Sequence, residues 1–188
     1  MNETKVTYCN FDSPLGEMIA GATDDGVCFL EWHDRGGVDR IKERVIKRYR
    51  AQLEEGSNRH LELLKKELEK YFSGSLKKFS VPVAVKGTPF EMRDWEQLLE
   101  IPYGSTISYG ELARRMGNAN ASRAVGRANG ANYLSIVIPC HRVIEANGKL
   151  RGYGGGLWRK QHLIDLEAGI APSFIENPAA KTSTNATR

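Results

Sequence analysis

A cysteine, a histidine and an arginine follow one another at Cys140, His141 and Arg142, directly after Pro139. A thiol is a nucleophile only as the thiolate, so a reactive cysteine needs a base or a positive charge within reach. The ring of Pro139 fixes the backbone here and provides no amide hydrogen. Because neighbouring side chains of an extended chain point to opposite faces, we expect His141 to act on Cys140 through a turn or a bridging water.

A histidine base in turn needs a third group that orients its ring. Glu167 is the candidate, since it lies in the last turn of a helix predicted over residues 157–168, just before Gly169. A carboxylate at the C-terminus of a helix opposes the helix dipole by roughly 0.3–1 kcal/mol, which favours a cationic or imidazole partner. The alternative interpretation of Glu167 is a solvated surface carboxylate.

The segments around Cys140 have the patterns of a strand, a turn and a loop. Residues 135–138 form the run Ser-Ile-Val-Ile, which is typical of a buried strand. Asn147-Gly148 is a strong signal for the two-residue turn of a hairpin. Residues 151–156 are rich in glycine, and we expect a loop there that lies against another part of the protein.

A helix-turn-helix pattern precedes this region. Residues 88–91 and 108–111 are capping boxes that open two helices, the second of which ends at Met116. A third helix is predicted from about Asn120 to a C-terminal stop at Gly130. Two short helices joined by a turn that contains glycine are typical of this DNA-binding unit, although ordinary helical cores contain such pairs as well.

The third helix carries Arg123 and Arg127 among alanine, serine and glycine residues. Small side chains let a helix backbone approach a partner closely. Residues 101–170 hold nine Lys and Arg against four Asp and Glu, and this basic balance favours an acidic partner such as DNA. We therefore count both arginines as candidate DNA-binding residues, and the alternative is a solvated basic face.

The first part of the chain has the pattern of a small sheet with helices. Apolar segments within residues 4–33, separated by turn residues, predict an antiparallel meander. Residues 40–53 and 58–72 are predicted helices, with Asn58 as the N-cap of the second. Residues 77–87 are predicted to form a linker or a short strand.

Composition excludes several classes of protein. The 188 residues are 40% hydrophobic and 27% charged, which is ordinary for a globular domain. We find neither a run long enough for a transmembrane helix nor the apolar core of a signal peptide. Three cysteines without a close pair favour a reducing compartment. Cys9, Cys28 and His33 are too scattered for the four ligands of a zinc site, so we expect no metal and no cofactor.

Several motifs outside the cysteine segment complete a family pattern. In order along the chain they are Ser13-Pro14-Leu15-Gly16, Ile101-Pro102-Tyr103-Gly104, Ser108-Tyr109, Arg123-Ala124-Val125-Gly126, Asn132, Tyr153-Gly154-Gly155-Gly156 and Glu167-Ala168-Gly169. Together with residues 138–143, Ile-Pro-Cys-His-Arg-Val, they resemble the 6-O-methylguanine-DNA methyltransferase family, the suicidal alkyl-transfer repair proteins. The resemblance is dense over residues 88–170 and thinner over residues 1–87.

The resemblance implies roles for four catalytic residues. Cys140 resembles the acceptor that takes the alkyl group from the 6-oxygen of guanine. His141 resembles the base that deprotonates it through a water, and Glu167 resembles the group that orients His141. Asn132 resembles the asparagine that braces the active-site turn.

The resemblance also implies residues that bind the substrate. Tyr109 resembles the tyrosine that helps to flip the nucleotide and bonds the guanine ring, and Arg123 resembles the arginine that replaces the flipped base in the stack. Val143 and Tyr153 match the guanine pocket. The family often has serine where this chain has Gly154, so we expect a tuned substrate preference there rather than lost activity.

The expected fold class is α+β. Residues 1–87 are predicted to form a support domain with a small antiparallel sheet and helices, which the resemblance implies is ribonuclease H-like. Residues 88–170 are predicted to form a mostly helical, winged helix-turn-helix domain that carries the chemistry. Residues 171–188 have almost nothing to bury and are predicted to be a disordered tail.

The expected function is single-turnover, irreversible repair of DNA. An alkyl group, above all methyl, passes from 6-O-alkylguanine or 4-O-alkylthymine to Cys140 after nucleotide flipping. The expected partner is duplex DNA with alkylated bases, bound by a monomer mainly through the helix-turn-helix, in the cytoplasm or in a eukaryotic nucleus. The alternatives are a Cys–His hydrolase, a helix-turn-helix regulator with an inert cysteine, and a non-catalytic lesion-binding relative, against which the presence of Cys140 counts.

Overall fold

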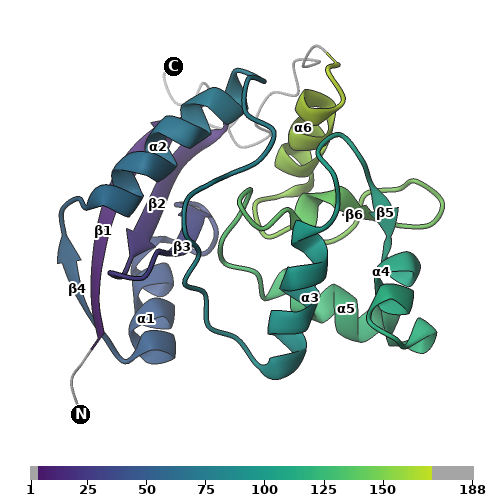
Figure 1. The fold of residues 1–188 in the computed structure, drawn as a ribbon, viewed down its shortest axis with the longest axis horizontal. Helices are drawn as coiled ribbons and strands as arrows, with labels where there is room; N and C mark the ends of the chain where they lie inside the picture. The colour runs from purple at the N-terminus through teal and green to yellow at the C-terminus, as the bar shows by residue number, and fades with distance from the viewer. Residues whose placement is uncertain (1–3, 171–188) are drawn as a thin grey trace, which may run out of the picture.

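The computed structural model describes residues 4–170. An N-terminal sheet with two helices lies beside a C-terminal group of short helices (Figure 1). The predicted tail, residues 171–188, lies outside the described residues. The architecture is α+β, as predicted, with the small sheet in the first half and the helix-turn-helix in the second.

The N-terminal sheet has four strands in the order β3-β2-β1-β4. Strands β1 (Thr4–Ser13), β2 (Gly16–Ala22) and β3 (Val27–Trp32) form the predicted antiparallel meander. Strand β4 (Ala51–Glu55) is parallel to β1, so the complete sheet is mixed. Every residue of β3 is buried.

The parallel strand corrects the helix predicted over residues 40–53. Helix α1 (Val38–Tyr49) ends at Arg50, which adopts the left-handed conformation with φ 50°. The chain then extends and pairs with β1, which turns Ala51 inward. The strand is short and mostly polar, so its pattern was too weak to separate it from the helix before it.

Helix α2 (Arg59–Phe72) crosses the sheet and packs on β2 and β3 (Figure 1). The Asn58 side chain accepts hydrogen bonds from the amides of His60 and Leu61, which is the predicted N-cap. The apolar face of α2 is buried against the sheet, and this contact forms much of the core of the first half.

The C-terminal half is built around three helices. Helices α3 (Pro89–Leu99), α4 (Tyr109–Arg115) and α5 (Ser122–Gly130) pack on one another, and a 3-10 turn, Ala119–Ala121, joins the last two. The helix-turn-helix arrangement therefore forms as predicted.

The two predicted capping boxes differ in the structure. The box from Thr88 to Glu91 is complete, with both reciprocal hydrogen bonds. In the second, the Ser108 hydroxyl accepts from the Glu111 amide, but the Glu111 carboxylate bonds the arginines of its own helix instead. Two guanidinium groups on the next turn outcompete the neutral backbone amide.

A two-stranded parallel ribbon and a last helix complete the fold. Strand β5 (Ile107–Ser108) pairs with β6 (Val143–Ile144), and α6 (Leu157–Glu167) follows the glycine-rich loop. The turn at Asn147 and Gly148 forms, closed by a hydrogen bond from the Glu145 amide to the Lys149 carbonyl at 3.0 Å. No second strand of a hairpin follows among the described residues, because β6 has β5 as its partner.

The strand predicted over residues 135–138 is wrong. Leu134 makes a single parallel bridge to Leu30 of β3, and the chain then turns, with Ile136 at a φ of 70°. The Ile138 amide bonds back to the Leu134 carbonyl at 3.0 Å. The run is apolar because this turn is buried between the two halves, and burial alone does not distinguish a buried turn from a buried strand.

Over residues 4–170, no helix has both the length and the apolar character required to span a bilayer.

Candidate active site

Cys140 begins a single turn of 3-10 helix, Cys140–Arg142, directly after Pro139. Cys140 is only 8% exposed. The Asn132 amide nitrogen donates to the Cys140 Sγ at 3.1 Å and to the Ile138 carbonyl at 2.9 Å, while the Asn132 side-chain oxygen accepts from the Leu134 amide at 2.9 Å. Asn132 thus ties the sulfur to the buried turn that precedes it.

Glu167 ends α6 and points into the protein, where five hydrogen bonds converge on its carboxylate. The Oε1 lies 2.8 Å from the His141 Nε2. Arg142 donates from Nε at 2.8 Å and from Nη2 at 3.0 Å. The Tyr71 hydroxyl and the Gly104 amide donate at 2.7 and 3.1 Å. This arrangement excludes the solvated-carboxylate alternative.

These contacts set the charges of Glu167 and His141. Burial opposes ionisation of Glu167, but the hydrogen bonds and charges of His141 and Arg142 outweigh it and hold the Glu167 pKa well below its ordinary value. Burial lowers the pKa of His141 below its ordinary value, in spite of the neighbouring carboxylate. The imidazole is therefore neutral at neutral pH and is able to accept a proton.

The free nitrogen of this imidazole is the one that can serve the thiol. The His141 Nε2 faces Glu167, whereas the His141 Nδ1 is buried and has no hydrogen-bond partner among residues 4–170. No direct hydrogen bond joins Cys140 to His141 within the same residues. A water that links the Cys140 thiol to the His141 Nδ1 stays a prediction.

The thiol is buried beside positive charge. Burial raises the pKa of Cys140, and the Asn132 hydrogen bond and the charges of Arg35 and Lys160 oppose that rise. Lys160 is itself fully buried, donates to the Arg151 carbonyl at 2.9 Å, and has its pKa lowered to about 8 by burial. Two cations therefore favour the thiolate once a base has taken the proton.

Tyr109 and Tyr153 lie within electrostatic range of the Cys140 thiol, and Val143 follows the turn that carries it. The Tyr109 hydroxyl donates to the Arg151 carbonyl at 2.9 Å, and burial raises the Tyr109 pKa to about 12, so the hydroxyl remains a neutral donor. The Tyr153 ring packs edge-on against Trp32 with centroids 6.0 Å apart. Val143 is fully buried in β6, directly after the Cys140–Arg142 turn.

The two arginines of α5 face solvent. Arg123, Gly126 and Arg127 line an open hollow on the surface. A Cβ atom added to Gly126 would lie 3.9 Å from the Tyr109 ring, so this face of α5 adjoins the predicted substrate tyrosine. The hollow is open, and two of its three lining residues are cationic.

Four residues at this site have no assigned role in the sequence analysis. Tyr71 lies on the apolar face of α2, where it reads as an ordinary core residue. Arg35 lies in the polar segment after β3 and Lys160 lies in α6, and only the fold brings their charges near Cys140. Arg142 stood beside the cysteine, but its bonds to Glu167 depend on where α6 ends.

The residues weighed for zinc lie apart from one another. Cys9 and Cys28 are buried with free thiols, and the His33 Nε2 lies 3.0 Å from the Asn10 Oδ1. Within residues 4–170, no three His, Cys, Asp or Glu side chains are grouped so that they could hold a metal ion.

Two family models match nearly the whole described chain. Residues 6–85 match the ribonuclease-like domain of 6-O-methylguanine DNA methyltransferase, and residues 89–169 match its DNA-binding domain. A methylated-DNA–protein-cysteine methyltransferase of Methanosarcina acetivorans is 39% identical over 160 residues, which are 85% of this chain and 97% of that protein. The protein of the same description from Mycobacterium tuberculosis is 53% identical over 109 residues, which are 58% of this chain and 66% of that protein.

Solved structures give the same result for the fold. The crystal structure of Mycobacterium tuberculosis OGT in complex with DNA superposes with a TM-score of 0.76 at 39% identity, covering 89% of this chain and 96% of that one. The geometry around Cys140, both family models and a relative matched over 97% of its length point to the same family. The chain belongs to the 6-O-methylguanine-DNA methyltransferase family.

Proposed function

We propose that this chain repairs DNA directly, by transferring the alkyl group of a 6-O-alkylguanine in duplex DNA to the Sγ of Cys140. The bond between the alkyl carbon and the guanine oxygen breaks as a carbon–sulfur bond forms. The thiol gives up its proton and the guanine ring takes one up, so the restored base leaves a thioether on the protein. The same chemistry acts on 4-O-alkylthymine. Because exchange does not undo a thioether, each molecule acts once and needs no cofactor.

The observation that supports this proposal best is the buried chain of contacts from Glu167 to His141, beside a sulfur held by Asn132. Neutral His141 takes the thiol proton at Nδ1 through a water, and Glu167 stabilises the resulting imidazolium. Lys160 stabilises the thiolate.

A base inside duplex DNA is out of reach of a protein thiol, so the nucleotide must leave the stack at a free energy of a few kcal/mol. Helix α5 enters the minor groove, where Arg123 takes the place of the flipped base and Arg127 contacts phosphate. The Tyr109 hydroxyl donates to the guanine, and Val143 and Tyr153 line its pocket.

The crystal structure of the Mycobacterium tuberculosis relative in complex with DNA supports DNA as the partner. We place the protein as a monomer in the compartment of the genome, the cytoplasm of a prokaryote or the nucleus of a eukaryote. The free thiols of Cys9, Cys28 and Cys140 suit that reducing setting.

Intact mass after incubation with a duplex that contains one 6-O-methylguanine tests the proposal. We expect the mass to rise by one methylene per chain, with the modified peptide containing Cys140. Cys140→Ala abolishes the mass change and leaves DNA affinity nearly intact. Cys9→Ala is the matched control, since Cys9 is also a free cysteine that is 8% exposed.

Two results would contradict the proposal. Repeated turnover with an unmodified protein would indicate a Cys–His hydrolase. Binding to one DNA sequence without any mass change would indicate a regulator with an inert cysteine.

A further inference from the structure

We infer that Arg35, from the N-terminal half, positions the alkyl-acceptor turn and occupies the space that a side chain at position 154 would fill. The inference rests on the proposed function, since the reaction that it serves is transfer to Cys140. It gives the first half of the chain a part in the chemistry and gives a physical reason for glycine at position 154.

The Arg35 side chain joins the two halves at the segment that holds the sulfur. Arg35 follows β3, and its Nη1 donates to the Asn132 carbonyl at 2.8 Å while its Nη2 donates to the Gly130 carbonyl at 2.9 Å. The Arg35 Nη1 also donates to the buried Glu31 carboxylate at 3.2 Å, which further fixes the guanidinium. Asn132 in turn donates to the Cys140 Sγ. Arg35 is therefore one residue removed from the reacting atom.

The same contact fixes the end of the proposed DNA-reading helix. Gly130 is the last residue of α5, and the carbonyls of a final helical turn lack partners within the helix. A cation at this end also suits the helix dipole. Arg35 thus fixes the position of the C-terminal end of α5 relative to Asn132.

The charge of Arg35 acts on the thiol as well. Arg35 and Lys160 are the two cations that lower the Cys140 pKa against the effect of burial. Lys160 lies in α6 of the C-terminal half, so the thiol receives positive charge from both halves.

Gly154 leaves room for this guanidinium. A Cβ atom added at Gly154 would lie 2.3 Å from both the Cζ and the Nε of Arg35, far inside van der Waals contact. The guanidinium has little freedom to move, because three hydrogen bonds hold it. The serine that is frequent in the family at this position would therefore displace Arg35 from Asn132.

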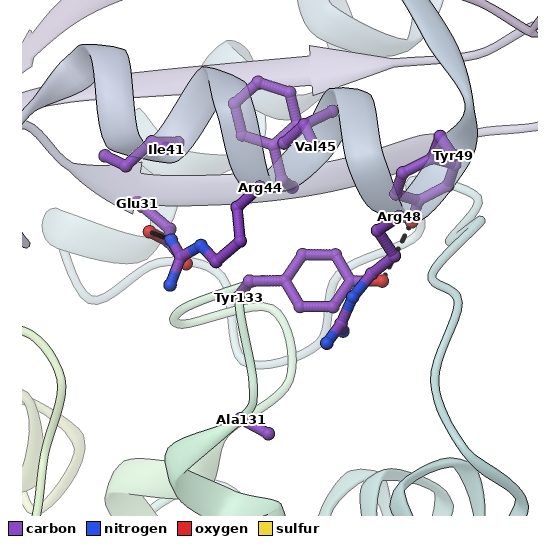
Figure 2. A pocket seen from close by; sticks show the side chains of 9 residues that line it. Glu31, Ile41, Arg44, Val45, Arg48, Tyr49, Ala131 and Tyr133 are labelled. Carbon is purple, nitrogen blue, oxygen red and sulfur yellow. Dashed lines mark hydrogen bonds and ion pairs between the residues drawn. The ribbon is translucent and has the colours of Figure 1, made fainter.

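The segment that Arg35 bonds is also held from the side of α1. Figure 2 shows the pocket between α1 and the segment that contains Ala131 and Tyr133. Tyr133 is held on the far side by a hydroxyl contact with Tyr49 at 3.0 Å and by the Arg48 guanidinium over its ring. Tyr133 directly follows Asn132 in the chain, so the aromatic contacts hold this segment on the side of α1 and the Arg35 hydrogen bonds hold it at Gly130 and Asn132.

A double-mutant cycle on the full-length protein tests the inference with wild type, Arg35→Met, Gly154→Ser and the double variant. Transfer from free 6-O-benzylguanine measures the reaction, and iodoacetamide labelling of Cys140 against pH measures the thiol without any repair substrate. We expect Arg35→Met to slow transfer by about tenfold and to move the labelling profile to higher pH. Gly154→Ser slows transfer by a similar factor alone but by less than about twofold in the Arg35→Met background.

Arg35→Lys separates charge from hydrogen bonding. It keeps the cation but loses the two-pronged contact, so the labelling profile stays near that of wild type while transfer slows. Arg40→Met, at an exposed arginine of α1, is the matched control and changes neither readout.

Equal slowing by Gly154→Ser in both backgrounds overturns the inference, and so does a wild-type rate and labelling profile for Arg35→Met. If Arg35→Met does not fold, Arg35→Lys replaces it in the cycle. The inference is then overturned if Gly154→Ser slows transfer equally in the wild-type and Arg35→Lys backgrounds. Failure of the proposed function is seen separately, as a wild-type protein that takes no methyl from DNA while its labelling still depends on Arg35.

Discussion

At the scale of single residues, the site depends on one carboxylate with an unusual number of donors. Glu167 accepts from a phenol, a guanidinium, an imidazole and a backbone amide, and it lies where a helix dipole disfavours negative charge. Its ionisation is maintained entirely by those donors. Removing the charge therefore affects both the stability of the fold and the orientation of the His141 ring.

We predict that Glu167→Gln destabilises the protein by about 3 kcal/mol at pH 7, since Arg142 is left buried without its counter-ion. Because the folded pKa of Glu167 is depressed, its contribution is complete above the unfolded pKa of about 4.3 and is lost as pH falls further. The difference between the two proteins in urea unfolding therefore shrinks between pH 5 and the acid limit. Asp165→Asn, on the same helix, is the control. A difference that does not change with pH would mean that the role of Glu167 is packing alone.

Asp94 is a buried carboxyl group whose pKa is shifted in the opposite direction to that of Glu167. It lies in α3 with no exposure, neither carboxylate oxygen has a hydrogen-bond partner within residues 4–170, and burial raises its pKa to about 7. The folded state thus holds a proton that the unfolded state releases near pH 4, so stability falls as pH rises from about 4 through 7.

We predict that Asp94→Leu stabilises the protein at pH 8 by on the order of 2–4 kcal/mol, and by less at pH 5, where the wild-type carboxyl is neutral. Urea unfolding at the two pH values measures the gain. Glu96→Gln, an exposed change on the same helix, leaves stability nearly constant. A loss of stability at pH 8 would show that the folded protein needs the Asp94 charge.

The sequence alone identified the site residues whose side chains have unusual chemistry or an unusual position. Cys140 and His141 stood out as adjacent reactive groups, and Glu167 stood out because its position opposes a dipole. Tyr71 and Lys160 could not be found in this way, since a tyrosine on an apolar helix face and a lysine in a polar helix are ordinary until the fold brings them to the site.

At the scale of elements, helices were predicted more reliably than the segments between them. Caps at Asn58 and Thr88 mark helix starts through local hydrogen bonds, so sequence alone determines them. The turn over residues 135–138 depends on the bridge between Leu134 and Leu30, and strand β4 depends on its pairing with β1. No local sequence pattern reveals these distant partners. The reactive turn is therefore a tertiary feature, and so is the position of the sulfur.

Helix α5 gives a prediction that separates DNA handling from chemistry. Arg123→Ala should slow transfer from duplex DNA by about tenfold or more, since nothing then compensates the few kcal/mol of lost stacking, while transfer from free 6-O-benzylguanine changes little. Arg127→Ala is the comparison variant and mainly weakens binding in a salt-dependent way. Equal slowing of the two reactions by Arg123→Ala would remove Arg123 from nucleotide flipping.

At the scale of the whole molecule, buried side chains cross between the halves. Arg159 of α6 is 3% exposed, donates to the Leu15 carbonyl at 2.9 Å and to Asp34, and lies over the Trp32 and Trp158 rings. These contacts join the last helix to the first sheet. The two halves should therefore unfold together.

We predict that Arg159→Met costs about 3 kcal/mol, because the carbonyls that it bonds are left buried without a donor. Asp34→Asn costs less than about 1 kcal/mol, since that carboxylate is largely exposed. Urea unfolding followed by tryptophan fluorescence and by circular dichroism measures both. Two separate transitions in wild type would mean that the halves are independent.

The hydroxyl that Tyr71 sends to Glu167 comes from the half that carries none of the reactive atoms. A polypeptide that is clipped within the early sheet or α2 loses that bond and the Arg35 contact together. Glu167 then keeps its bonds to Arg142 and Gly104 but has one donor fewer. We therefore expect a clipped copy to take up alkyl groups more slowly than an intact one, which spares a sulfur that can be used only once.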